Sequence, residues 1–111
     1  MNANPLIVSA LSPLNMPVEP NVYLGTAAEY IVFNYVLEDS ALFADDTDIN
    51  DETTIRVNYF TKSNPKANTK IIRRLLREAG FSIASTQELY ESDTAYTHVI
   101  IEVNISGVID D

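Results

Sequence analysis

Alternating apolar and polar positions predict several strands in this chain. Residues 30–37 read YIVFNYVL, a run of β-branched and aromatic side chains that is typical of a strand. Residues 53–60 and 98–105 alternate between apolar and polar side chains, which is the period of a strand with one buried face. Residues 81–90 follow a weaker version of this pattern. Because strands adjacent in sequence usually pair, we expect residues 30–37 and 53–60 to form an antiparallel hairpin with a long loop.

A helical period replaces this alternation after Asn64. Asn64 and Pro65 supply a helix cap and a first-turn proline, and Gly80 supplies the stop. The apolar positions between them fall on one side of a helical wheel: Ile71, Ile72, Leu75 and Ala79. Four basic positions fall on the opposite side, Lys66, Lys70, Arg73 and Arg77, with Arg74 nearby. These five residues are called the basic stripe below. This separation predicts one long amphipathic helix.

The first 25 residues contain four of the five prolines in the chain. A short helix is predicted from Pro5 to about Leu11, where Pro13 ends it. The later prolines keep the chain extended as far as Gly25. This segment either docks on its own domain or forms an arm that reaches a neighbouring subunit.

These elements predict a single α+β domain over residues 1–111, with residues 1–25 as a Pro-rich N-terminal helix and extended arm. Residues 26–111 form the sheet-and-helix core. We expect about four mainly antiparallel strands, with the long amphipathic helix across one face and the short N-terminal helix beside it.

Composition narrows the class of protein. Apolar residues make up 46% of the chain, too large a share for a disordered chain despite the net charge of -9. The absence of cysteine excludes disulfides, thiolate catalysis and cysteine-based zinc sites. The N-terminal residues lack the positive region of a signal peptide, and no apolar run approaches the roughly 18 residues of a membrane span. We therefore expect an intracellular protein.

Charge is sorted along the chain. Six of the seven Lys and Arg residues fall between Lys62 and Arg77, and seven of the sixteen acids fall between Glu38 and Glu52. The acids that we expect to take part in an interface are Asp45, Asp46, Asp48, Asp51 and Glu52. A basic helix and an acidic loop on separate elements suit a head-to-tail contact between copies, which closes into a ring when the rotation allows.

Two other interpretations of the basic stripe stay open. The stripe can be an ordinary solvated face, since runs of charge usually are. It can also contact nucleic acid, although no aromatic residues interleave with the Lys and Arg to stack on bases. The acidic balance of the whole chain argues against tight duplex binding as its main task.

Motifs for catalysis and metal binding are not found in the sequence. His98 is the single histidine, and the chain has no phosphate-binding loop or nucleophile elbow. Residues 46–50 begin like a calcium-binding EF-hand loop, but Asp51 replaces the required glycine and Val57 the bidentate glutamate. A weak divalent site of another kind stays an alternative there. We expect no catalytic residues, no metal and no cofactor, so the chain is not expected to be an enzyme.

Four stretches resemble a known family in their order and spacing. They are YLGTAAEYIVFNY from Tyr23, an acidic ADD loop followed by TIRVNYF, the helix IIRRLLREAGF, and LYESDTAYTHVIIEVNI ending at Ile105. Together they resemble the tail-terminator (tail-completion) proteins of long-tailed bacteriophages, especially those that infect Gram-positive hosts.

The resemblance implies a small α+β domain that assembles as a ring, typically a hexamer, on the head-proximal end of the phage tail tube. Such a ring stops tube growth and joins the tail to the head. The implied partners are other copies of the chain, the tail tube protein and the head-tail connector protein, while genome DNA passes the lumen without specific binding. The implied location is the virion tail, and the host cytoplasm during assembly. The family has no catalytic residues.

Two other functions compete with this one. A head-completion or neck connector protein also forms rings, but on the portal side. A non-phage binding module would use the basic helix for an acidic partner or for nucleic acid.

Overall fold

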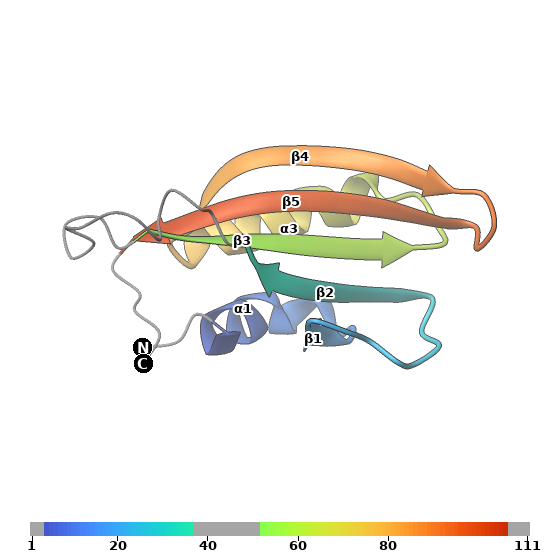
Figure 1. Ribbon diagram of the computed structural model, residues 1–111, viewed down its shortest axis with the longest axis horizontal. Helices are drawn as coiled ribbons and strands as arrows, with labels where there is room; N and C mark the ends of the chain where they lie inside the picture. Colours follow the sequence, from blue (N-terminus) through green and yellow to red (C-terminus); the bar gives the residue numbers. More distant parts are fainter. Residues whose placement is uncertain (1–3, 37–51, 107–111) are drawn as a thin grey trace.

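The computed structural model describes residues 4–36 and 52–106 of the chain (Figure 1). The N-terminal part holds helix α1 (Asn4–Leu11), the short 3-10 helix η1 (Ser12–Leu14) and strand β1 (Val18–Pro20). The elements that follow are β2 (Glu29–Tyr35), β3 (Glu52–Thr61), α3 (Lys66–Glu78), β4 (Ser82–Glu91) and β5 (Tyr96–Ser106). No helix in the described ranges is long and apolar enough to cross a membrane.

The strands form one mixed sheet of five strands in the order β1-β2-β3-β5-β4. Strand β2 pairs with β3, β3 with β5, and β5 with β4, all antiparallel, and the first of these pairs is the predicted hairpin. Strand β1 runs parallel to β2. The predicted fold of about four mainly antiparallel strands is therefore wrong in strand number and in sheet type.

The missed strand has a physical explanation. Pro17 and Pro20 hold the segment around Val18 extended, as expected from their fixed backbone angles. Three residues are too few to show an alternating pattern, so the sequence gives no signal that this extended segment pairs. The main-chain bond from Ile31 N–H to the Pro17 carbonyl, 2.8 Å long, attaches it to β2.

Both helices cover the same face of the sheet (Figure 1). Helix α1 contributes Ile7 and Leu11, and α3 contributes Ile72 and Leu76, all without solvent exposure. Alternate residues of β2, β3 and β5 meet them from the sheet: Ile31, Phe33, Ile55, Val57, Tyr59, Val99, Ile101 and Val103. Helix α1 is thus docked on its own domain, which was one of the two predicted arrangements.

The ends of α3 follow the predicted signals. The Asn64 side chain accepts a hydrogen bond of 3.0 Å from the Lys66 backbone N–H. At the other end, Gly80 has φ of 103°, which suits glycine, and Phe81 N–H bonds to the Leu76 carbonyl. The predicted apolar side needs one correction, since Leu76 is fully buried and Ile71 is only half-buried.

Candidate functional site

The structure describes all five residues of the basic stripe, on the part of α3 that does not face the core. Arg74 lies 3.8 Å from Glu78, a contact between two exposed side chains of the same helix. In the described residues, the other four stripe cations make no ion pair. The stripe therefore presents charge that its own described surroundings leave uncompensated.

Part of the stripe surrounds a shallow hollow. Lys70, Arg73 and Arg77 line a depression of about 230 Å³ on the surface of α3. Arg73 is half-buried, and its Nε atom has no hydrogen-bond partner in the described part of the chain. That Nε atom is itself buried, so a partner would meet the three cationic side chains that line the hollow instead. Clustered Lys and Arg groups favour a carboxylate or phosphate. The hollow is thus suited to an acidic group of a partner.

The acids predicted to face the stripe lie mostly outside the described residues. They are Asp45, Asp46, Asp48 and Asp51. Glu52 opens β3, but its side chain is also outside the described set. The calcium alternative at residues 46–51 falls in the same segment. The contact between the acidic loop and the basic stripe therefore stays a prediction.

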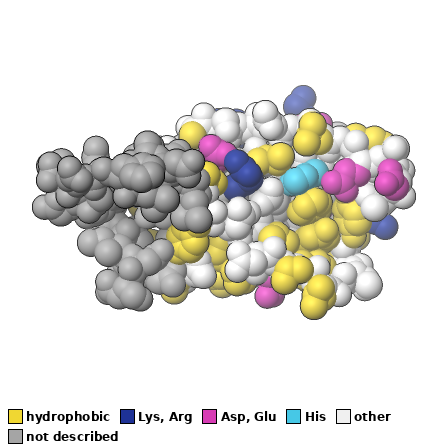
Figure 2. All heavy atoms as spheres, viewed as in Figure 1, with side chains coloured by type: hydrophobic (Ala, Val, Ile, Leu, Met, Phe, Trp, Pro, Cys, Tyr) yellow, Lys and Arg dark blue, Asp and Glu magenta, His cyan; other side chains and the backbone are white. Residues whose placement is uncertain are grey.

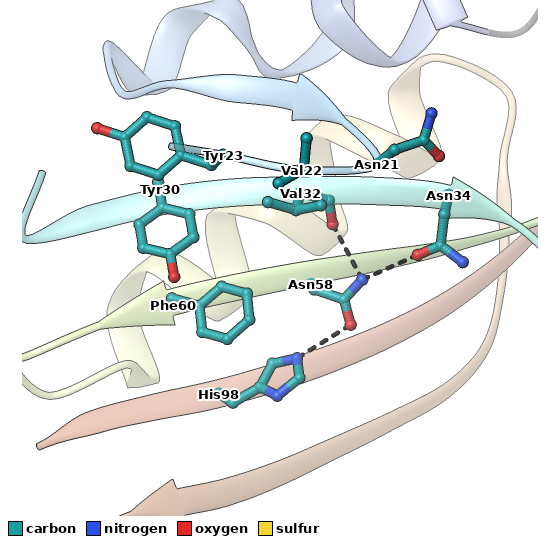
Figure 3. A pocket seen from close by; sticks show the side chains of 9 residues that line it. All are labelled: Asn21, Val22, Tyr23, Tyr30, Val32, Asn34, Asn58, Phe60 and His98. Carbon is teal, nitrogen blue, oxygen red and sulfur yellow. Dashed lines mark hydrogen bonds between the residues drawn. The ribbon is translucent and has the colours of Figure 1, made fainter. Parts of the chain in front are cut away.

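The face of the sheet opposite the helices carries a row of rings that the sequence analysis missed. Tyr23 stacks on Tyr30 with ring centroids 4.5 Å apart, and Tyr30 stacks on Phe60 at 4.7 Å. Phe60 in turn stacks on the His98 imidazole at 4.1 Å (Figure 3). Leu89 of β4 lies opposite His98 and ends the row. Hydrophobic side chains gather beside the histidine on this face (Figure 2).

The connection between β1 and β2 is fastened beneath this row. The Tyr23 hydroxyl accepts a hydrogen bond of 3.0 Å from Ala27 N–H, and the Tyr96 hydroxyl donates one of 2.8 Å to the Ala27 carbonyl. A Cβ atom at Gly25 would overlap the Tyr23 hydroxyl, so glycine leaves room for this ring to fold back. Leu24 is therefore exposed to solvent on a connection that hydrogen bonds to Tyr23 and Tyr96 hold in place.

A shallow hollow of about 290 Å³ lies between this connection and the polar centre of the open face (Figure 3). The Asn58 side-chain amide donates to the Val32 carbonyl at 3.0 Å and to Asn34 Oδ1 at 3.2 Å. Its oxygen therefore remains for His98 Nε2, 2.9 Å away, which must carry the proton in this contact. Burial lowers the pKa of His98, while nearby Glu91 opposes the shift.

These contacts limit what His98 can do chemically. Its Nε2 atom is committed to Asn58, and its Nδ1 atom lies 3.9 Å from a Glu91 oxygen. With the proton on Nε2, the neutral ring keeps Nδ1 as its acceptor nitrogen. Among the described residues, no hydroxyl bonds to Nδ1, so His98 is not paired with a nucleophile there. Among residues 4–36 and 52–106, no three His, Asp or Glu side chains are grouped as metal ligands.

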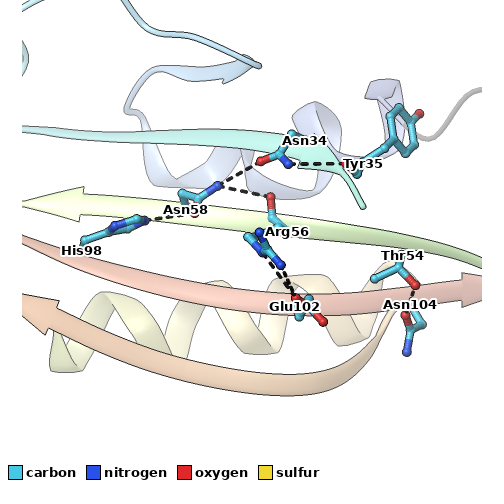
Figure 4. Close-up of polar contacts among 8 residues, drawn as sticks. All are labelled: Asn34, Tyr35, Thr54, Arg56, Asn58, His98, Glu102 and Asn104. Carbon is cyan, nitrogen blue, oxygen red and sulfur yellow. Dashed lines mark hydrogen bonds and ion pairs between the residues drawn. The ribbon is translucent and has the colours of Figure 1, made fainter. Parts of the chain in front are cut away.

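Further along the open face, polar pairs replace the rings (Figure 4). Arg56 of β3 bonds to Glu102 of β5 at 2.9 Å, and Thr54 donates to Asn104 at 2.7 Å. Both are direct cross-strand pairs in the sheet. This end of the face is therefore polar and internally satisfied, whereas the other end is aromatic.

A second polar cluster lies on the helix side. The Tyr59 hydroxyl donates to Glu29, and Asn68 of α3 donates to Glu29 at 2.9 Å and to the Tyr59 oxygen at 3.0 Å. Burial and the hydrogen bond to Glu29 raise the pKa of Tyr59. The cluster ties the first turn of α3 to two strands, which is a structural role.

Neither the models of known protein families nor the curated proteins contain a match to this chain. The function must therefore be argued from the surfaces described above.

Proposed function

We propose that this chain is a ring-forming structural protein, a tail terminator that closes the phage tail tube and joins it to the head. The observation that carries the proposal is the basic stripe, four of whose five cations make no ion pair among the described residues. The order of sequence stretches that resembles tail terminators supports it further. The proposed role is structural, with no catalytic step, metal or cofactor.

In the proposed ring, the stripe of one copy meets acidic residues of the next. The chain has a net charge of -9, so other copies of it present acidic surface. This acidic surface attracts the unpaired cations of the stripe. Such a contact joins two different surfaces, so its repetition builds a ring when the rotation between copies allows closure. The acidic balance also suits a lumen through which genome DNA passes without binding.

The proposed partners are therefore other copies of the chain, the tail tube protein below the ring and the head-tail connector protein above it. The proposed location is the head-proximal end of the virion tail, after assembly in the host cytoplasm. The number of subunits that we propose is six, from the family resemblance alone.

Deleting the gene from the phage that encodes it tests the function directly. We expect negative-stain electron microscopy of the lysate to show overlong tail tubes without heads, beside full heads. Tails of normal length beside unattached heads would assign the protein to the neck instead. Unaltered virions would refute a structural role.

Charge reversal on the stripe tests the interface. We expect the variant Lys70→Glu with Arg77→Glu to weaken assembly by about 1 kcal/mol per interface, roughly fivefold, because exposed ion pairs contribute about 0.2–1 kcal/mol each. The matched control, Lys70→Arg with Arg77→Lys, keeps both charges and should assemble normally. Sedimentation velocity at low and high salt measures both. Equal assembly of the two variants would mean that the stripe is only a solvated face.

A further inference from the structure

The two edge strands of the sheet, β1 and β4, differ in how well they are protected against pairing with another chain. Strand β1 has three residues, ends at Pro20 and packs against α1. Strand β4 has ten residues, is exposed along almost its whole length and contains neither lysine nor proline. Its protection is limited to two glutamates and a bulge between Ile83 and Ser85. A long edge of this kind can pair with another chain.

Exposed apolar side chains mark both edges. Five large apolar residues of the described chain are strongly exposed: Val8, Val22, Leu24, Leu89 and Tyr90. Leu89 and Tyr90 belong to β4, with 52% and 67% of their surface exposed. Val22 and Leu24 belong to the β1–β2 connection at the other edge, with 58% and 89% exposed. Four of the five therefore lie at the two side edges.

The row of rings places these two apolar pairs at the same level of the sheet. Leu89 begins the row at the β4 edge, and Tyr23 ends it on the β1–β2 connection. Val22 and Leu24 are the sequence neighbours of Tyr23. One copy thus carries exposed apolar side chains at each end of a single cross-strand row. Leu89 shares the face of the row, whereas Tyr90, which pairs with Thr97, points to the opposite face.

We propose that the β4 edge of one copy docks against the β1–β2 connection of the next, so that the row of rings continues from subunit to subunit. This inference rests on the proposed ring and adds a second subunit contact to the one proposed for the basic stripe. We infer that the binding partner is a second copy of the chain. The two patches differ, lie at opposite edges of the sheet and belong to the same cross-strand row. A head-to-tail contact covers both patches, and its repetition closes into a ring when the rotation between copies allows.

Charge supports the same pairing. Lys62 lies beside the β1–β2 connection, since its backbone N–H bonds to the Ala28 carbonyl. Its ammonium group rests over the Tyr96 ring, 4.9 Å from the centroid, and makes no ion pair among the described residues. Two acids follow the β4 patch, the half-buried Glu91 and the exposed Asp93. The proposed contact brings Lys62 of one copy towards these acids of its neighbour.

Engineered cysteines test this contact cleanly, because the chain contains none. We pair Val22→Cys or Leu24→Cys with Leu89→Cys or Tyr90→Cys in one chain, giving four double variants. After mild oxidation, at least one should give a ladder of covalent oligomers on a non-reducing gel. Each single variant should give no product beyond a trace of dimer. A mixture of the two single variants should stop at a dimer that contains one of each.

Other results would overturn the proposal. Efficient dimers of Leu89→Cys alone would mean that two β4 edges pair with each other. A ladder from Arg74→Cys with Leu89→Cys, but from none of the four pairs, would place β4 on the neighbour's α3. No ladder from any of these variants, while native mass spectrometry shows wild-type rings, would refute this contact and leave the ring intact. A wild-type chain that forms no rings, even with tail tubes, would refute the proposed function as well.

A second pair of variants avoids dependence on disulfide geometry. Leu24→Asp and Leu89→Asp each place a charge in the proposed contact and should weaken assembly at least tenfold. The matched control is Val8→Asp, at an exposed apolar position on α1 that lies outside the row. Thermal melts confirm that all three variants fold. Assembly of Leu24→Asp and Leu89→Asp at the wild-type level would contradict the proposal.

Discussion

The two faces of the sheet are built from the same strands but differ in what covers them. On β5, Val99, Ile101 and Val103 are fully buried beneath the helices. The alternate residues His98 and Ile100 point to the open face, which no described helix covers (Figure 1). The covered face stabilises the fold by removing apolar surface from water, whereas the open face keeps rings and amides accessible. Side chains one residue apart can therefore have separate roles.

The neighbours Ile101 and Ile100 give the largest expected contrast between the faces. Ile101→Ala should lower the free energy of unfolding by about 2–5 kcal/mol, because it leaves a cavity in a packed core. Ile100→Ala should cost about 1 kcal/mol, because that side chain is half-exposed. Urea unfolding of both variants measures the difference. Equal losses would mean that the open face is as tightly packed as the covered one.

The polar cluster within the covered face gives the next largest effect. Tyr59→Phe removes the hydroxyl that bonds to Glu29 and Asn68, and we expect a loss of about 1–3 kcal/mol. The pKa of Tyr59 is raised in the folded state, so its contribution is complete below the ordinary value of about 10 and is lost as the pH rises above it. Between pH 8 and pH 11, the melting temperature should therefore fall less in Tyr59→Phe than in the wild type. An equal fall would contradict this role.

The smallest effect should come from His98 on the open face. Its pKa is lowered in the folded state, so its contribution is complete above about pH 6.5 and is lost as the pH falls through the folded value. His98→Gln keeps a donor for Asn58 but cannot titrate. The variant should lose less stability than the wild type between pH 7 and pH 5. An NMR titration of the imidazole that gives a pKa above 6.5 would contradict the prediction.

Local patterns predicted the elements of the covered face well. The alternation in residues 53–60 and 98–105 corresponds to β3 and β5, and the capped amphipathic segment corresponds to α3. These signals are local, because a strand with one buried face repeats every two residues and a helix ends at glycine. The parallel strand β1 was missed because three residues between prolines carry no such repeat.

The features of the open face could not be predicted in the same way. The row of rings joins Tyr23, Phe60 and Leu89 only through the register of β2, β3, β5 and β4. The Glu29 cluster likewise collects side chains from two strands and a helix. Register follows from the whole sheet, so single residues give no warning of these contacts. The basic stripe was visible because all its members belong to one helix.

The place of β5 in the sheet has a consequence for how the protein folds as it is made. Strand β5 lies between β3 and β4, although it follows both in sequence. A nascent chain leaves the ribosome from its N-terminus, so β4 has no partner strand until β5 emerges. Until then, only β1, β2 and β3 can pair, and the sheet lacks two of its five strands. Complete folding of this domain should therefore wait for β5, and a ribosome stalled before Tyr96 should hold a chain that is sensitive to proteases.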